Sequence, residues 1–325
     1  MKTLSKVTAL IAAAALTFSL SACAATSDAS FAGLASTCDP FVGGTGVDKI
    51  NVSGSAGAVP TVKFDLPLTS DKIETKVITE GDGPAFIGDQ FVELEFMAIN
   101  GSTGETLQAT KFNGTDFSAQ VIASGSYPDF CHAISGAKQG SRLAVLFPAA
   151  FAHNSEGNEE SGLAKNDSVV YVIEVRRVYL PYAVGEAQSE QSGFPSVVRA
   201  ENGTPGITQL KSGAPAEFKM ATLIKGAGDT VTQGDTVTLH YSGFVWGGEK
   251  FDSSWDRGQP AQFELAAGQL IEGFIKALDG QTVGSQVIAV IPPSEGYGEQ
   301  EQGSIPANST LIFVIDILGT TKPAN

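Results

Sequence analysis

The sequence predicts an α+β fold made of two copies of one small domain, each a twisted antiparallel sheet wrapped around one short helix. Three observations support this prediction: runs with two-residue apolar alternation, one stretch with helical spacing, and an internal repeat. A length of 325 residues also fits about two domains.

The repeat is clearest around the predicted helix. The second half of the chain reads FIKALDGQTVGSQVIAV at 274–290, and the first half reads FCHAISGAKQGSRLAVL at 130–146, with two glycines at equal spacing. Upstream, VTLHYSGF matches VELEFMAI in the same order, and further blocks follow. Several blocks in one order favour two copies of one domain. We predict domains at 59–180 and 205–320 and a linker at 181–204.

The elements of the second copy can be recognised in order. TVTLHYSGF at 236–244 alternates apolar and polar residues, as a half-buried strand does, and AQFELA is a second short strand. LIEGFIKALDG has apolar residues at helical spacing and Gly280 at its end. SQVIAVIPP is a strand that stops at two prolines, and TLIFVIDIL closes the sheet.

The first 22 residues predict an export signal. Lys2 and Lys6 precede an apolar run that is too short to span a bilayer comfortably, and no acidic residue occurs before Cys23. The run ends in LSAC, which resembles the lipobox of bacterial lipoproteins. That resemblance implies removal of the signal at 1–22 and a lipid on Cys23. An ordinary secretory signal is the alternative. We expect an extracytoplasmic protein, lipid-anchored to the bacterial cell membrane, with a tether at 23–58.

The cysteine count adds a second expectation. With Cys23 acylated, Cys38 and Cys131 are the remaining cysteines, in an oxidising compartment where disulfides persist. One bridge between them would tie the N-terminal segment to the first domain. Two free buried thiols are the alternative.

The charge limits the classes of partner. The net charge of −15 becomes −17 once the signal is removed, because that segment holds two lysines and no acid. Nucleic acid binding needs clustered Lys and Arg, so we expect no nucleic acid partner. Adhesion to anionic lipid by charge alone is disfavoured for the same reason.

Several kinds of catalytic site lack support in the sequence. It contains no HExxH, no Cys-x-x-Cys, no Gly-x-Ser-x-Gly and no phosphate-binding glycine loop. We therefore predict no metal and no cofactor. His240 falls on the polar face of its predicted strand, where a hydrogen-bonded histidine is a better interpretation than a metal ligand.

Aromatic residues are the strongest candidates for a binding site. Core packing would explain any one of them, but Phe251 and Tyr297 lie on predicted loops, where an aromatic ring is unfavourable unless it lines a pocket. Asp252 and Arg257 share the turn of Phe251 and would place a paired carboxylate at the pocket rim. Capping of the turn is the alternative role for Asp252.

Five blocks carry a resemblance to a known family. HYSGF, KFDSSWDRGQP, LIEGFIKALDG, VIPPSEGYG and IPANSTLIFVIDIL, in this order, resemble the FKBP-type peptidyl-prolyl cis-trans isomerase domain over about 205–320. The resemblance implies isomerisation of X–Pro bonds in exported polypeptides, without a cofactor, and a site for tacrolimus-type macrolides. It implies Asp252, Tyr297 and Tyr241 as catalytic residues. It also implies that substrate is bound by Phe251, Phe263, Leu270, Ile271, Phe274, Ile305 and Phe313.

The second copy departs from the family pattern in three places. Phe274 stands where a tryptophan is usual, which we expect to alter macrolide affinity. Ala261 replaces a larger apolar residue and would open one wall. The flap sequence EQEQGS is acidic and would change which peptides are accepted.

The first copy keeps the apolar positions and loses the polar ones. Phe96, Leu107, Gln108, Tyr127 and Phe130 fall opposite Tyr241, Phe251, Asp252, Ile271 and Phe274, and the tyrosine at 297 is replaced by Ala152 or Phe151. We predict an FKBP-like fold with little or no activity, serving as a spacer or a peptide-binding module. An unusual active site is the alternative.

Three functions compete for the whole chain. Extracytoplasmic prolyl isomerisation is the leading prediction, and a non-catalytic peptide-binding chaperone is the runner-up. A solute-binding lipoprotein would need a larger α/β chain with a hinge between two lobes, and the repeated β-rich domain argues against it.

Overall fold

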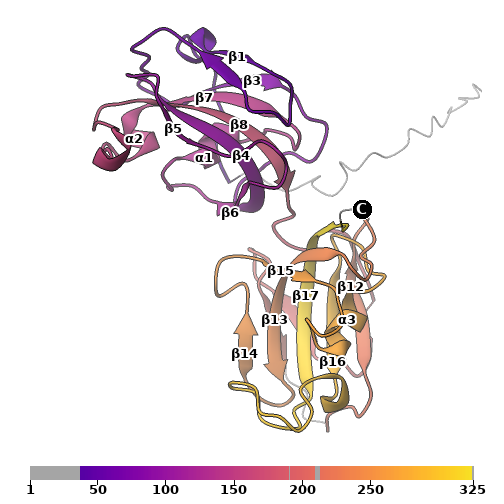
Figure 1. The fold of residues 1–325 in the computed structure, drawn as a ribbon. Helices are drawn as coiled ribbons and strands as arrows, with labels where there is room; N and C mark the ends of the chain where they lie inside the picture. The colour runs from indigo at the N-terminus through magenta and orange to yellow at the C-terminus, as the bar shows by residue number, and fades with distance from the viewer. Residues whose placement is uncertain (1–36, 190, 209–212, 324–325) are drawn as a thin grey trace, which may run out of the picture.

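The computed structural model describes residues 37–189, 191–208 and 213–323, which form two sheets in succession along the chain (Figure 1). The predicted signal, Cys23 and the first part of the predicted tether lie outside the described residues.

The first sheet has six antiparallel strands within the described residues. They are β3 (Glu74–Thr79), β4 (Gln90–Asn100), β5 (Thr106–Ala109), β6 (Ser118–Ile122), β7 (Arg142–Phe147) and β8 (Val169–Val178). Their hydrogen-bonded order is β3–β7–β8–β4–β5, and β6 also pairs with β4. Two short helices accompany the sheet, α1 (Phe130–Ile134) and α2 (Ala149–Ala152).

The second sheet has seven antiparallel strands within the described residues. They are β9 (Glu186–Ala187), β12 (Lys219–Lys225), β13 (Thr236–Val245), β14 (Lys250–Ser253), β15 (Ala261–Glu264), β16 (Gln286–Ile291) and β17 (Leu311–Thr321). Their order is β14–β13–β17–β16–β12–β9, and β15 also pairs with β13. Helix α3 (Glu272–Leu278) packs on this sheet, chiefly over β16.

The two sheets have the same connectivity. The order β12–β16–β17–β13–β14 repeats β3–β7–β8–β4–β5 strand for strand. The register also repeats, because Phe96 lies opposite Ile173 in the first sheet and Tyr241 lies opposite Ile315 in the second. The predicted α+β class is therefore confirmed, with an antiparallel sheet and a short helix in each copy.

Helix α3 follows its predicted pattern. Phe274 and Leu278 are buried on the face toward the sheet, and Gly280 has a φ of +78° just after the helix end. Glycine adopts this left-handed conformation without steric penalty, so it stops the helix there.

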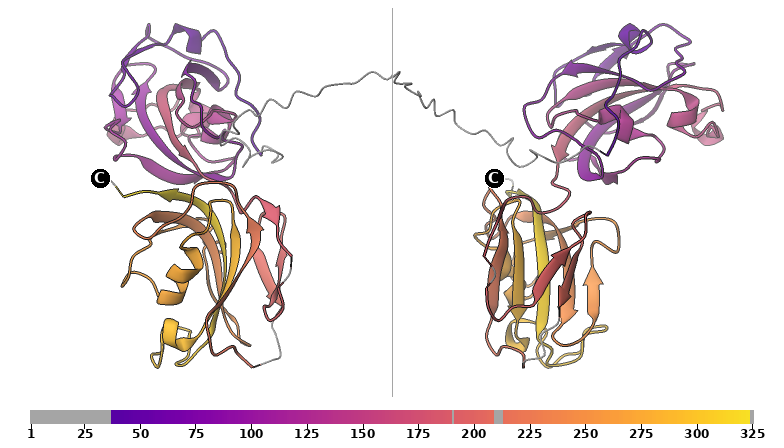
Figure 2. Two further views of the ribbon diagram at one scale, coloured as in Figure 1. Left: turned by 90° about the vertical axis from the view of Figure 1, so that its right-hand side faces the viewer. Right: turned by 180° about the vertical axis from the view of Figure 1, so that it is seen from behind.

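Each sheet has a second apolar face that a separate hairpin covers. In the second sheet, Ile288, Val290 and Val314 point away from α3 and are buried. Hairpin β10–β11 (Ser196–Arg199 and Pro205–Thr208) packs on them through Val197 and Ile207. Figure 2 shows this hairpin and α3 on opposite sides of the sheet. A matching hairpin covers the first sheet, β1–β2 (Asn51–Ser53 and Thr61–Lys63).

These hairpins correct the predicted boundaries. The segment 181–204 is not a plain linker, because β9 pairs with β12 and β10 lies in a hairpin on the second sheet. Residues 47–58 of the predicted tether are likewise folded, with helical turn η2 (Val47–Lys49) and strand β1. The physical reason is that strands with apolar residues on both faces need cover on both.

In each domain a buried acid on the sheet takes part in hydrogen bonds that hold a neighbouring segment of the chain against the sheet. In the second sheet, Asp316 accepts hydrogen bonds from Ala183 N at 2.8 Å and Gln286 Nε2 at 2.7 Å. At the equivalent positions of the first sheet, Glu174 pairs with Arg142. The Arg142 guanidinium also donates to three backbone carbonyls in the β1–β2 loop, those of Gly54, Ser55 and Ala58.

Cys38 and Cys131 are joined by a disulfide. Of the two arrangements considered from the sequence, a bridge or two free thiols, the structure has the bridge. Their Cα atoms are 5.6 Å apart and 93 positions separate them in the chain. The bridge ties the segment before β1 to helix α1. By the chain-entropy estimate, a closed loop of this length stabilises the folded state by roughly 4–5 kcal/mol.

The two domains touch where β8 ends. Tyr179 and Leu180 pack against Leu318 at the end of β17, and Leu180 N donates to Leu318 O at 3.4 Å. Arg177 Nη1 donates to Thr320 O at 3.2 Å. The C-terminal end of β17 is thus the part of the second sheet that the first domain contacts.

We predict that Asp316→Asn stabilises the protein at pH 7.5. Burial raises the pKa of Asp316 to about 6, although hydrogen bonds from Ala183 and Gln286 act against it. Because this pKa exceeds the unfolded value, the folded chain binds more protons between pH 4 and 6, and stability falls as pH rises through that window. Removing the buried charge should raise the free energy of unfolding by roughly 1–3 kcal/mol at pH 7.5 and much less at pH 4.

Urea unfolding of the full chain at the two pH values measures this difference. Asp229→Asn, at an exposed position of the same domain, is the matched control and should change neither value. A variant at Asp316 that is less stable than the wild type at pH 7.5 would contradict the prediction.

Candidate active site

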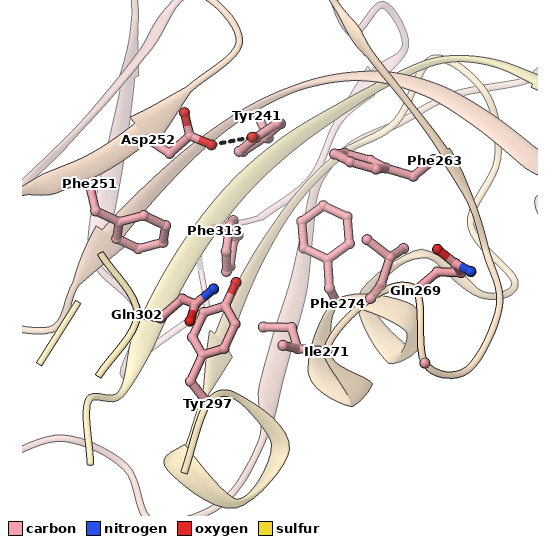
Figure 3. A pocket seen from close by; sticks show the side chains of 12 residues that line it. Tyr241, Phe251, Asp252, Phe263, Gln269, Ile271, Phe274, Tyr297, Gln302 and Phe313 are labelled. Atoms are coloured by element: carbon pink, nitrogen blue, oxygen red, sulfur yellow. Dashed lines mark hydrogen bonds between the residues drawn. The ribbon is translucent and has the colours of Figure 1, made fainter. Parts of the chain in front are cut away.

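A pocket of about 500 Å³ opens on the second domain between the sheet, the start of α3 and the loops that follow β15 and β16 (Figure 3). It is lined by Tyr241, Phe251, Asp252, Phe263, Gly268, Gln269, Leu270, Ile271, Phe274, Tyr297, Gln302 and Phe313.

Aromatic rings packed edge to face form the floor and walls. The Phe274 and Phe313 centroids are 5.0 Å apart at 84°, and those of Phe251 and Phe313 are 5.6 Å apart at 83°. Tyr241 and Phe313 reach this floor from neighbouring strands, because alternate residues of β13 and β17 face α3. Edge-to-face packing places positive ring edges on negative faces and holds the rings in place.

Gly243 on β13 makes this ring arrangement possible. A Cβ at that position would lie 2.5 Å from Phe251 Cζ and 3.0 Å from Phe313 Cε1. Any larger residue would push one ring out of the pocket wall.

Three side chains make a polar edge at one end of the pocket. The Tyr241 hydroxyl and Arg257 Nη1 each donate a hydrogen bond to a different oxygen of Asp252. Arg257 Nη2 donates to the Tyr241 hydroxyl at 3.1 Å, and the guanidinium lies 5.6 Å above the Tyr241 ring. The carboxylate is thus held by two donors, one neutral and one charged.

The pKa values at this edge follow from these contacts. Burial alone would raise the pKa of Asp252, but the hydrogen bonds from Tyr241 and Arg257 outweigh it and lower that pKa below its usual value. Burial and the Asp252 charge raise the pKa of Tyr297, and they act in the same direction on Tyr241. At neutral pH the site therefore holds an ionised carboxylate and neutral tyrosines able to donate.

The flap differs from its predicted arrangement. Ile305 was predicted to bind substrate, but it is 4% exposed, packs in the domain core and does not line the pocket. Gln302 and Ile305 close a tight turn through reciprocal backbone hydrogen bonds of 2.9 Å. Inside this turn the apolar side chain is buried and the polar one, Gln302, faces the pocket beside Tyr297 (Figure 3).

The other predicted site residues come together in the pocket. They are Tyr241, Phe251, Asp252, Phe263, Leu270, Ile271, Phe274, Tyr297 and Phe313. The sequence reasoning missed Gly268, Gln269 and Gln302. Gly268 and Gln269 directly precede Leu270, so the loop before the helix was the available signal.

Aromatic rings also pack on one another in the equivalent region of the first domain. Phe147 and Tyr171 stand where the second domain has Ile291 and Phe313, and their centroids are 5.4 Å apart. Tyr171 also packs at 5.3 Å from Phe130, and burial raises its pKa to about 12. Gln108 pairs with Ala98 in the first sheet, and Asp252 pairs with Gly243 at the equivalent place in the second. The first domain therefore has an amide side chain where the second has the carboxylate.

The described residues offer neither a metal site nor a membrane-spanning helix. They contain no group of three or more His, Cys, Asp or Glu placed to hold a metal ion. In the same residues, no helix combines the length and apolar character that a membrane span requires.

Comparisons with known proteins point to one family. A family model for the FKBP-type peptidyl-prolyl cis-trans isomerases matches residues 227–318. FK506-binding protein 2 of Dictyostelium discoideum is 42% identical over 118 residues, which are 35% of this chain and 89% of that protein. An FK506-binding protein of Streptomyces anulatus is 39% identical over 107 residues, 32% of this chain and 86% of that protein.

One solved structure with partial similarity is FkpA from Escherichia coli. Its alignment has 29% identity, covers 42% of this chain and 55% of that chain, and has a TM-score of 0.32.

We predict that Arg257→Gln raises the pKa of Asp252. The variant removes a charged donor and its positive field, while the burial that raises the pKa stays in place. Carboxyl carbon-13 NMR during a pH titration measures the pKa directly. Lys250→Gln is the matched control, because Lys250 pairs with Asp256 of the same turn. An unchanged Asp252 titration in Arg257→Gln would show that the ion pair does not set this pKa.

Proposed function

We propose that this chain, which belongs to the FKBP-type peptidyl-prolyl cis-trans isomerases, isomerises X–Pro bonds of exported polypeptides in the aromatic pocket of its second domain. The observation that carries the proposal is the pocket itself. It combines a floor of packed rings with a polar edge of Tyr241, Asp252 and Arg257.

The reaction needs no nucleophile. The X–Pro bond interconverts over a barrier of about 18–20 kcal/mol that amide resonance sets. Twisting the C–N bond removes this resonance and its charge separation. A pocket of aromatic rings therefore disfavours the planar, polar ground state relative to the twisted one. Lowering the barrier by about 7 kcal/mol gives roughly a 10⁵-fold rate.

The polar groups supply orientation. Tyr297 is neutral, lines the pocket and is suited to donate a hydrogen bond to a substrate carbonyl. Asp252 is a charged acceptor that lines the pocket, and its two donors hold it in one geometry. Such fixed groups raise the fraction of bound peptide in the reactive pose. Phe263, Leu270 and Ile271 would hold the prolyl ring and its neighbours.

We propose a different role for the first domain. Gln108 at the carboxylate position supports a spacer or a peptide-binding module with little or no turnover. A tacrolimus-type macrolide should accordingly bind the second domain, where the rings of the pocket and its polar edge are both present.

A peptide-binding chaperone without turnover is the second candidate for the chain. The exposed Tyr127, 55% accessible at the first-domain position of Ile271, favours some peptide contact there. Activity of the wild-type protein on a proline-limited peptide separates the two candidates, because a pure chaperone would give no catalysed rate.

We propose that the protein is extracytoplasmic and attached to the bacterial cell membrane by lipid on Cys23. The Cys38–Cys131 disulfide supports an oxidising compartment. The LSAC sequence supports acylation.

Asp252→Ala should lower kcat/KM for the peptide by roughly tenfold or more, because it removes a charged hydrogen-bonding group from the pocket edge. Gln108→Ala, the same change at the equivalent first-domain position, is the matched control and should leave the rate unchanged. Protease-coupled assays on the full chain measure both. An equal loss in the two variants would refute the assignment of activity to the second domain.

Cys23→Ser should move the protein from the membrane fraction to the soluble extracytoplasmic fraction, because a serine offers no thiol for the lipid. Thr26→Ala, three residues further on, should leave the protein in the membrane fraction. Mass spectrometry of the mature N-terminus supplies a second readout. A wild-type N-terminus without lipid would rule out the anchor and leave the proposed activity untouched.

A further inference from the structure

The turn that follows β14, residues 254–258, rests on the strand behind the pocket through a stacked pair of rings. Trp255 lies on His240 with ring centroids 3.9 Å apart and planes at 19°. His240 is the neighbour of Tyr241 on β13 and is buried. Burial and the charge of Arg257 lower the pKa of His240 to about 4, so Trp255 stacks on a neutral ring at neutral pH.

Ser254 locks the same turn to the backbone of Tyr241. Its hydroxyl oxygen accepts from Tyr241 N at 2.9 Å and forms a 2.8 Å hydrogen bond with His240 Nδ1. Ser254 N donates in turn to Tyr241 O at 3.0 Å. Asp252 comes two residues before Ser254 and Arg257 three residues after it. The hydrogen bonds of Ser254 therefore help to position both residues that bond to the Tyr241 hydroxyl.

Trp255 also lies against the hairpin turn between β10 and β11, at its ring atom Cη2. A Cβ at Gly203 would lie 2.9 Å from Trp255 Cη2 and 2.6 Å from Tyr182 Cβ. Trp255 also borders a cavity of about 460 Å³ that is lined in part by Phe91 and Leu180 of the first domain and by Tyr182 of the connecting segment. Trp255 Nε1 is buried and makes no hydrogen bond among the described residues, so packing and stacking alone hold the ring.

We propose that Trp255 is a positioning residue for the isomerase reaction, which transmits the placement of the β10–β11 hairpin to Tyr241, Asp252 and Arg257 at the pocket edge. The ring meets the hairpin at Cη2 and stacks on His240, and Trp255 is not among the residues that line the pocket. Trp255 therefore acts on the reaction through the turn that carries Arg257. The inference rests on the proposed function.

Because the aromatic floor does not involve Trp255, the two kinetic constants should respond differently. In Trp255→Ala, we expect kcat to fall by about five- to tenfold and KM to stay within about twofold, as for a displaced orienting group beside an intact binding surface. Trp255→Phe keeps a ring that can stack on His240 and should recover at least about half of the lost kcat.

Phe117→Ala is the control for loss of an aromatic side chain. Phe117 lies in the first domain and is 38% exposed. Its loss should leave both kcat and KM unchanged. The proposal is overturned if Trp255→Ala acts through KM alone, if Trp255→Phe recovers nothing, or if Phe117→Ala gives the same split.

A second pair of variants tests the link from outside the pocket and leaves Trp255 in place. Gly203→Ala would press on Trp255 and Tyr182, whereas Gly193→Ala, with a similar φ of +88°, has as its nearest neighbour only Lys219 Nζ at 4.0 Å. Both replacements carry the same backbone strain, so their difference isolates the contact.

Gly203→Ala should lower kcat of the full chain by about two- to fivefold relative to Gly193→Ala, with equal KM. Equal kcat values in the two variants would overturn the coupling. Absence of turnover in the wild type would instead refute the proposed function, so the two failures are distinguishable.

Discussion

Strand β17 is apolar on both of its faces, and most of the second domain is arranged to keep water from it. Phe313, Ile315 and Ile317 point toward α3, while Ile312 and Val314 point to the opposite side. Burying one face produces the ring-lined pocket, since Phe313 is part of its floor. The opposite face is buried by the β10–β11 hairpin. The turn of this hairpin also lies next to Trp255, in the turn that carries Arg257.

The same connectivity occurs in both copies, but the residues at the pocket positions differ. Gln108 of the first copy stands at the position of Asp252, and Leu107 at the position of Phe251. On the two equivalent strands, Phe147 replaces Ile291 and Tyr171 replaces Phe313. The loss of the carboxylate removes the charged group of the polar edge, while the aromatic character of the strand floor is kept.

The resemblance to the family implies most of the pocket residues, and periodicity places three of them on regular elements. Alternation puts Tyr241 and Phe313 on strands, and helical spacing puts Phe274 on α3. The resemblance also implied Ile305, but in the flap, where no periodic pattern shows which side chain is buried, Ile305 is buried and Gln302 lines the pocket. The hairpins were missed because their strands have only three or four residues. The continuous apolar runs of β16 and β17 do indicate that a second face of the sheet is buried, and a covering segment could have been inferred from them.

The disulfide also decides how the first domain would carry mechanical load. Tension applied at the N-terminus enters the domain at Cys38 and passes through the sulfur atoms to Cys131. The backbone between these residues, which includes strands β1 to β6, lies inside the covalent loop and outside the path of the force. A pull between the N-terminus and the second domain would therefore be borne by β7, β8 and the segment that leads to the second domain, while the backbone of the loop between Cys38 and Cys131 stays unstretched.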